Sequence, residues 1–318
     1  MTSSTSTIAV TGASGFIGRR LVDRLQSRAG LRMRLLSRRA DDDLHVRGDL
    51  LQPDSLSGLI TPNASVVHLA YLRRESAADN ILAVRHLVDI CLRGGAKRLI
   101  LCSTADVVGA TREVVIDENV RGRPIDEYQR TKVAIEDVVR QAGANGLEVA
   151  ILRPTAVVGP GGANLRRLAE QILERRPVRD FALRSLQGKR RMNLVALDNV
   201  VAAIEFLIES DGRVVGETFF VSDDDDPHND FAGVYRMLRE RLLGNPPRLP
   251  RLPIPRQLIT GMLRTMGRPN WNVARTFDDG KLHRMGFRKP ASLPAAIEEF
   301  VGWYRSGGGE PTSRKVAA

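Results

Sequence analysis

The chain has 318 residues, enough to bury a large core as one large domain or as a large domain with a smaller one. A hydrophobic fraction of 42% and a charged fraction of 27% are typical of a soluble globular protein. The net charge of +11 is spread along the chain and aromatic residues make up only 5%, so we expect no stacking surface for nucleic acid. A solvated basic surface is favoured, and attraction of anionic substrates is the alternative.

Targeting and metal signals are weak. The N-terminus lacks the apolar core of a signal peptide, and no apolar run approaches the roughly 20 residues of a membrane-spanning helix. The only cysteines are Cys91 and Cys102, and neither they nor the scattered histidines have metal-ligand or redox spacing. We therefore expect a cytoplasmic protein without a metal site.

The chain is organised around a glycine-rich turn near its start. Residues 8–10 form a short apolar run typical of a buried strand, and apolar residues at helical spacing follow Gly18. Between them, Gly12 allows a tight turn, Gly15 allows close approach to a pyrophosphate, and Gly18 allows close packing of helix on strand. A strand, this turn and a helix, in that order, indicate a phosphate site at the helix N-terminus.

Apolar strands and helices then alternate. Further strands are predicted at 33–37, 44–46, 66–70, 98–102 and 147–152, with helices at 77–92 and 128–142. This alternation predicts an α/β fold with a doubly wound, Rossmann-type parallel sheet. Ligands of such sheets lie beyond the carboxyl ends of the strands.

The pattern changes after the turn-rich residues 157–162. Shorter elements follow, with strands predicted at 194–197 and 218–221 and helices at 165–174, 198–209 and 230–243. We therefore predict a dinucleotide-binding domain at 1–160 that shares some strands and helices with the second unit. Residues 161–306 are predicted to form a smaller α/β substrate-binding lid, and 307–318 a disordered tail.

Two segments of this second unit have more than one interpretation. The acids at 223–226 are expected to form a solvated loop rather than a metal site. The segment with Arg248, Arg251 and Arg256 alternates basic and apolar residues and is rich in proline. A lid edge is favoured for it, and contact with an anionic membrane is the alternative.

Tyr128 and Lys132 lie four residues apart, on one face of a predicted helix. A lysine cation nearby lowers the pKa of a tyrosine and suits it to acid/base chemistry; an exposed helix pair is the alternative. Ser103 and Thr104 directly follow the strand at 98–102. A hydroxyl at this place can bind a substrate oxygen or simply cap the next turn.

Together these motifs resemble the extended short-chain dehydrogenase/reductase family, in particular its nucleotide-sugar epimerase and dehydratase branch. The resemblance rests on the run 11–18, on Ser103-Thr104 with Gly109, and on Tyr128-x-x-x-Lys132. Supporting points are 48–50, 68–70, Asn80, 153–154 and 159–161, and in the C-terminal part 277–282, 285–287 and 303–304.

The resemblance implies roles for individual residues. Tyr128 would be the acid/base, Lys132 would lower its pKa and bind the nicotinamide ribose, and Thr104 would be the catalytic hydroxyl. Asp106 and Arg191 would join Thr104 and Tyr128 in binding substrate, while Gly18 and Asn80 would support the site. The implied cofactor-binding residues are Gly12, Ser14, Gly15, Phe16, Ile17, Ser37, Arg38, Arg39, Asp49, Leu50, Leu69, Ala70, Tyr71, Tyr128, Lys132 and Pro154.

Two departures from the family pattern bear on cofactor and substrate. NAD-preferring members carry an acid where this chain has Ser37, followed by Arg38, so NADP(H) is predicted over NAD(H). Many UDP-sugar epimerases carry an asparagine where this chain has Ala156, but Arg191 still resembles the arginine that contacts the sugar-nucleotide diphosphate.

Three functions are open at this point. The first is an NADPH-dependent reductase of a keto group on a nucleotide-linked sugar. The second is a nucleotide-sugar or lipid-linked-sugar epimerase or dehydratase that holds and recycles NAD, and the third is a non-catalytic dinucleotide-binding sensor. The helices at 77–92 and 128–142 resemble those that pair across a homodimer in this family, so a homodimer is expected.

Overall fold

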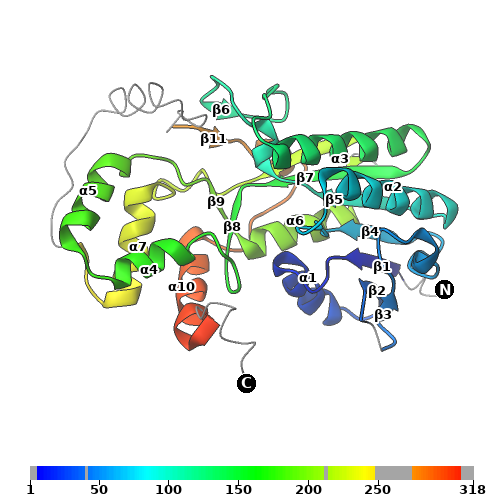
Figure 1. Ribbon diagram of the computed structural model, residues 1–318, viewed down its shortest axis with the longest axis horizontal. Helices are drawn as coiled ribbons and strands as arrows, with labels where there is room; N and C mark the ends of the chain where they lie inside the picture. Colours follow the sequence, from blue (N-terminus) through cyan, green and yellow to red (C-terminus); the bar gives the residue numbers. More distant parts are fainter. Residues whose placement is uncertain (1–5, 40–41, 211–213, 248–273, 309–318) are drawn as a thin grey trace.

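A seven-stranded parallel sheet forms the centre of the computed structural model, which describes residues 6–39, 42–210, 214–247 and 274–308 (Figure 1). Its strand order is β10-β7-β5-β4-β1-β2-β3, and every neighbouring pair is parallel. The strands are β1 (Ser6–Thr11), β2 (Leu31–Ser37), β3 (His45–Arg47), β4 (Ser65–His68), β5 (Arg98–Cys102), β7 (Glu148–Pro154) and β10 (Glu217–Val221).

Helices cover both faces of this sheet. On one face lie α1 (Phe16–Gln26) and α6 (Leu197–Glu209), and on the other α2 (Ala77–Arg93) and α3 (Glu127–Ala144) (Figure 1). Each pair encloses its own cluster of buried apolar side chains against the sheet. Because apolar residues cover the strands on both sides, the doubly wound fold predicted from the alternating pattern is confirmed.

The lid lies beyond the carboxyl ends of the central strands and has a separate apolar core. It contains α4 (Arg166–Leu173), α5 (Pro177–Gln187), α7 (Phe231–Leu243) and α10 (Leu293–Trp303), beside the paired strands β8 (Ala156–Val158) and β9 (Leu194–Ala196). The remaining elements are β6 (Val115–Ile116), which pairs with β11 (Thr276–Phe277), α9 (Gly280–Arg284), the 3-10 turns η1 (Pro53–Leu56) and η2 (Ala105–Val108), and a π-helical turn at Tyr304–Gly308.

The chain passes between the two units more than once. β10 and α6 come after residue 160, yet they belong to the central sheet and to the helix layer that covers it. The boundary predicted at residue 160 therefore does not separate the central sheet from the lid. After β9 the chain returns to the sheet with α6 and β10.

Several charged side chains lie deep in the described structure. Arg98 is 1% exposed, and its guanidinium donates hydrogen bonds to the carbonyls of Leu207 (2.6 Å) and Ser210 (2.8 Å) at the end of α6 and to Glu148. The solvated loop predicted for the acids at 223–226 is wrong for its first half. Asp223 and Asp224 are buried and accept backbone hydrogen bonds from Ala196 and Phe277, because they join β9 and β11 to the end of β10.

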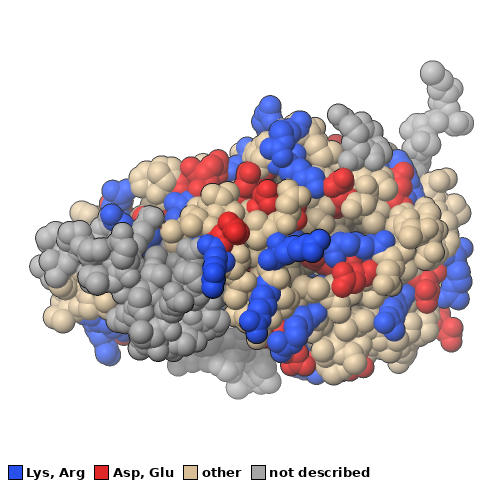
Figure 2. All heavy atoms as spheres, turned by 90° about the horizontal axis from the view of Figure 1, so that it is seen from above, with Lys and Arg blue, Asp and Glu red and all other residues tan. Residues whose placement is uncertain are grey.

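Several expectations stay predictions. Among the described residues no helix is long and apolar enough to cross a membrane, and no group of histidines, cysteines and acids could hold a metal ion. The basic, proline-rich residues 248–256 and the tail from 309 lie outside the described residues, and the homodimer stays a prediction. Figure 2 shows lysines and arginines interspersed with acids over one face, in keeping with a solvated basic surface.

Candidate active site between two cavities

The glycine-rich turn joins β1 to α1 at the carboxyl edge of the sheet. Gly12 has a φ of +76°, and a Cβ there would lie 2.7 Å from the backbone nitrogen of Ala70. A Cβ on Gly18 would lie 2.2 Å from the carbonyl oxygen of Gly12, so Gly18 packs against the turn itself rather than against the strand. α1 begins at Phe16 without a side-chain cap, which leaves its first N–H groups available to an anion.

A cavity of about 1170 Å³ opens over this turn. Of the sixteen cofactor-binding residues that the resemblance implies, fifteen line it, and Pro154 lies instead in a second cavity. The sequence analysis missed Leu72, Arg73 and Arg74, which follow β4 on the same wall. Two adjacent arginines after the strand at 66–70 are the signal that could have found them.

The far end of this cavity carries basic rather than acidic side chains. Ser37 ends β2, and its Oγ accepts a hydrogen bond from the backbone N–H of Arg39 (3.1 Å). Arg38 and Arg39 are exposed at the rim. Asp49 is the only acid among the described residues of this wall, and its carboxylate accepts from the N–H of Leu51.

Tyr128 and Lys132 lie one turn apart on α3 and both line this cavity. Lys132 is buried, and its Nζ lies 5.0 Å from the ring centroid of Tyr71, which in turn contacts the ring of Tyr128 edge to face at 5.2 Å. Burial and the negative charge of Asp106 raise the pKa of Tyr128 to about 12. The lowering predicted from the spacing of Tyr128 and Lys132 does not occur in the protein alone.

Thr104 and Asp106 form the start of η2, directly after β5. The Thr104 Oγ1 accepts a hydrogen bond from the backbone N–H of Asp106 (3.2 Å), which leaves its hydroxyl proton able to donate elsewhere. The Asp106 carboxylate faces the second cavity, where desolvation raises its pKa and the nearby Arg275 opposes that rise. Arg275 reaches this point from beside β11 and donates to the carbonyl of Gly109 (2.8 Å).

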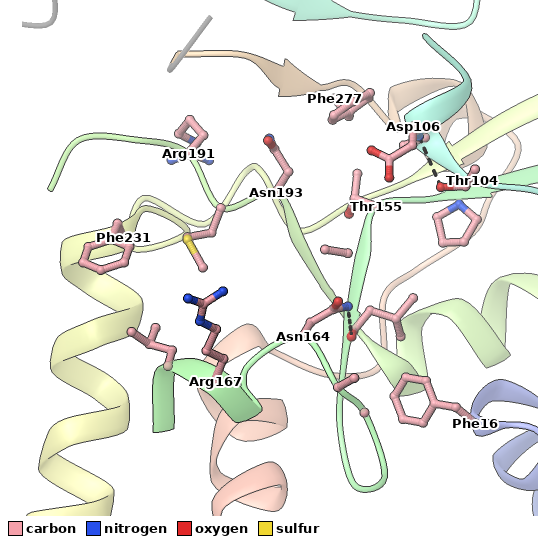
Figure 3. Close-up of a pocket in the computed structure, with 18 of the residues that line it drawn as sticks. Phe16, Thr104, Asp106, Thr155, Asn164, Arg167, Arg191, Asn193, Phe231 and Phe277 are labelled. Carbon is pink, nitrogen blue, oxygen red and sulfur yellow. Dashed lines mark hydrogen bonds between the residues drawn. The ribbon is translucent and has the colours of Figure 1, made fainter. Parts of the chain in front are cut away.

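The second cavity, of about 960 Å³, extends from these residues into the lid (Figure 3). Tyr128 lines both cavities, as do Phe16, Ile17, Arg73 and Ser103, so the two meet at this tyrosine. All four residues predicted to bind substrate, Thr104, Asp106, Tyr128 and Arg191, line the second cavity. Sequence analysis missed its lid wall, which includes Asn164, Arg167, Leu183, Asn193, Phe231 and Arg275.

Asn80 and His68 support the first cavity from outside it. Asn80 is buried on α2, and its side-chain amide bonds to both backbone groups of Leu72 and to the carbonyl of Ser76. It thereby fixes the loop that carries Arg73. His68 ends β4 and shares a 2.7 Å hydrogen bond with the Thr11 hydroxyl; burial lowers its pKa to about 3, so it is neutral.

Comparison with known proteins agrees with this geometry. Residues 8–221 match the model of the NAD dependent epimerase/dehydratase family, and this range covers β1 through β10 and thus the whole central sheet. The chain belongs to this family. A nicotinamide dinucleotide is accordingly its cofactor, and other solved structures with this fold contain NAD or NADPH.

The relatives that match this family member over nearly its full length include two bacterial proteins. Sterol demethylase protein B of Methylococcus capsulatus is 27% identical over 95% of this chain and 99% of its own. Ceramide reductase of Caulobacter vibrioides is 28% identical over 96% of each chain. Among solved structures, the UDP-glucose 4-epimerase of Thermotoga maritima with UDP-glucose covers 95% of this chain and 99% of its own, at 20% identity and a TM-score of 0.68.

Proposed function

We propose that this family member is an NADP(H)-dependent reductase of a keto group, with a nucleotide-linked sugar as the leading substrate class. The observation that carries the proposal is the place of Tyr128, where the cavity over the glycine-rich turn meets the cavity under the lid. A reaction between a bound dinucleotide and a second molecule requires a catalytic side chain at the point where the two binding cavities meet.

The residues of the first cavity fit a dinucleotide. Gly12 and Gly18 keep the turn free of side-chain atoms, and the uncapped start of α1 offers N–H groups to a pyrophosphate. Arg38 and Arg39 at the end of β2, with no acid at that position, favour a 2′-phosphate over a free ribose hydroxyl. A bound nicotinamide supplies the hydride for reduction of a ketone.

The protein's own residues supply binding and the proton. The Thr104 hydroxyl can donate a hydrogen bond to the ketone oxygen, which helps to hold the reacting carbonyl in place. Tyr128, with a pKa raised to about 12, keeps its proton at neutral pH and can donate it as negative charge develops on that oxygen. A protonated tyrosine thus supports the reductive direction.

The arginines of the second cavity support an anionic substrate such as a sugar nucleotide. A second candidate, a ketone or alcohol on a sterol or sphingolipid, is favoured by the full-length relatives, which include a sterol demethylase protein and a ceramide reductase. Epimerisation or dehydration with retained NAD is the alternative if the cofactor assignment fails.

The test begins with freshly purified protein, which is denatured so that any released dinucleotide can be identified by mass spectrometry. An empty site that binds NADPH more tightly than NADH is expected; retained stoichiometric NAD would instead indicate an epimerase or dehydratase. NADPH oxidation is then measured with 4-keto sugar nucleotides and with keto-sphingoid bases. Tyr128→Phe should lower turnover by about a hundredfold or more, a larger effect than on NADPH affinity, and unchanged turnover would refute the catalytic assignment.

A further inference from the structure

Helix α5 of the lid carries its charged and apolar residues on the opposite sides from those of an ordinary surface helix. Asp180 and Arg184 are buried, at 5% and 8% exposure, whereas Val178 is 78% exposed and Leu186 is 41% exposed. A surface helix in water turns its apolar side chains inward and its charged side chains outward. The outer face of α5 therefore favours contact with something other than water.

The buried charges of α5 have partners on the neighbouring helix α7. The Arg184 guanidinium lies over the ring of Tyr235, 5.5 Å from the ring centroid. The Asp180 carboxylate lies 3.8 Å from the guanidinium of Arg239. Turning α5 to bury its apolar residues would separate these charges from their partners. The lid thus fixes the orientation of α5, and with it the exposure of its apolar face.

The exposed apolar residues of α5 form a single stripe. Val178, Ala182 and Leu186 are spaced by four residues, which places them on one side of the helix, and all three are exposed. We call these three residues the α5 stripe. Leu173, at the end of α4, is exposed as well and lies only a short turn before α5 in the chain. Figure 1 shows α5 as the labelled lid helix farthest from the central sheet.

Basic residues lie at both ends of the α5 stripe. Arg175 and Arg176 precede the helix, Lys189 and Arg190 follow it, and all four are exposed. Among residues 173–190, all of which the structure describes, Glu174 is the only exposed acid, so positive charge is in excess. An apolar stripe between basic residues matches a surface that has anionic groups above an apolar interior. A membrane that contains anionic lipids is such a surface.

The inner side of the same helix reaches the second cavity. Leu183 and Gln187 of α5 line that cavity, beside Leu168 and Gln171 of α4. A helix with its side chains is about 10 Å across. A membrane in contact with the outer face of α5 would therefore lie only about one helix diameter from the wall of the second cavity.

We propose that the α5 stripe, together with the basic residues at its two ends, is a docking surface for a membrane that contains anionic lipids. The apolar side chains enter the boundary between headgroups and acyl chains, and the basic side chains contact lipid phosphates. This inference goes beyond the proposed function and does not depend on which substrate is reduced.

Vesicle binding tests this surface. The full-length protein is mixed at low salt with vesicles of phosphatidylcholine alone, or of phosphatidylcholine and phosphatidylglycerol in equal parts. The bound fraction is measured by co-sedimentation. Binding is expected to be stronger to the vesicles with phosphatidylglycerol and to weaken as salt is added, because the basic residues are exposed to solvent.

Val178→Asp should weaken binding to the anionic vesicles about tenfold or more, since it removes an apolar contact and adds a repelled charge. The helix should still form, because an acid in the first turn of a helix is favourable. Val114→Asp is the matched control, since Val114 is also exposed but precedes β6 rather than α5, and it should bind as the wild type does. Thermal unfolding checks that both variants are folded.

Replacing both Arg175 and Arg176 with glutamine tests the electrostatic part separately. Each basic residue near an anionic surface contributes about fivefold to binding, so the double variant should bind the anionic vesicles about tenfold or more weakly. It should lose little of any binding to phosphatidylcholine alone, which depends on the apolar stripe.

The inference would be overturned if the wild type did not bind the anionic vesicles at low salt, or if Val178→Asp bound them equally well. A second copy of the chain is the other candidate for this face. Sedimentation velocity without lipid should give wild type and Val178→Asp the same oligomeric state, and an oligomer that Val178→Asp dissociates would also overturn the inference. None of these measurements uses turnover, so they stand apart from the test of the proposed reduction.

Discussion

Replacing Arg38 with alanine should weaken NADPH binding about tenfold and change NADH binding by less than about twofold. Arg38 lies at the rim of the first cavity directly after β2, where the described lining carries Ser37, Arg38 and Arg39 rather than an acid. A hydrogen bond to a charged group contributes about 1.5–3 kcal/mol, and the exposure of Arg38 places its contribution near the lower end. About 1.4 kcal/mol corresponds to the tenfold change in Kd.

Calorimetric titration of both dinucleotides measures this difference directly. Arg47→Ala is the matched control, because Arg47 is exposed on the neighbouring strand β3 and does not line the cavity. Raising the salt concentration should reduce the NADPH preference of the wild type, since the rim arginines are exposed to solvent.

Ser37→Asp provides the opposite perturbation. It places a carboxylate at the end of β2, where an acid can accept hydrogen bonds from ribose hydroxyls and repel a 2′-phosphate. This variant should therefore prefer NADH. The reasoning would be refuted if Arg38→Ala weakened both dinucleotides equally, or if the wild type bound NADH more tightly than NADPH.

Three further perturbations test the supporting structure. Arg98→Met should lower the free energy of unfolding in urea by about 3 kcal/mol, because it leaves the buried end of α6 without its donor, whereas exposed Lys97→Met should change it by under about 0.5 kcal/mol. Gly18→Ala should abolish NADPH binding in calorimetry, since its Cβ cannot fit at 2.2 Å, while Gly302→Ala on α10, with no atom within 4 Å, should bind normally. The neutral His68 should make the free energy of unfolding decrease as the pH is lowered. The reason is that the unfolded chain takes up a proton on this residue near pH 6.5, and the folded chain only near pH 3. Between pH 7 and pH 5 the loss is about 2 kcal/mol by urea unfolding, and a His68→Gln variant with the same pH dependence would contradict this.

The central sheet could be predicted because its physical signal is local. The strand at 98–102 matches β5, and the helix at 77–92 differs from α2 by one residue. Strands covered on both faces are continuous apolar runs, and α2 is amphipathic with a complete capping box at Ser76. The places of the glycine-rich turn, Tyr128 and Lys132 in the site could be predicted from this order of strands and helices, because ligands bind beyond the carboxyl ends of parallel strands.

The lid could not be predicted to the same degree, since its contacts join distant segments. β6 pairs with β11 across about 160 residues, and each is only two residues long, too short for a recognisable pattern. Arg167 and Arg275 are two among many arginines, and only the tertiary fold brings them to one cavity. The run of acids at 223–226 looked solvated because local composition does not reveal the buried backbone donors that Asp223 and Asp224 accept from.

The largest departure from sequence reasoning concerns Tyr128 itself. Helical spacing placed Lys132 on the correct face of α3, but the ring of Tyr71 contacts both the Lys132 ammonium and the Tyr128 ring. Burial of Tyr128 and the carboxylate of Asp106 both oppose formation of a phenolate. The chain by itself therefore keeps the proton on Tyr128, the state needed to deliver it to a ketone oxygen. For oxidation of an alcohol the same side chain would first have to lose that proton, so the raised pKa of Tyr128 supports the proposed reductive direction.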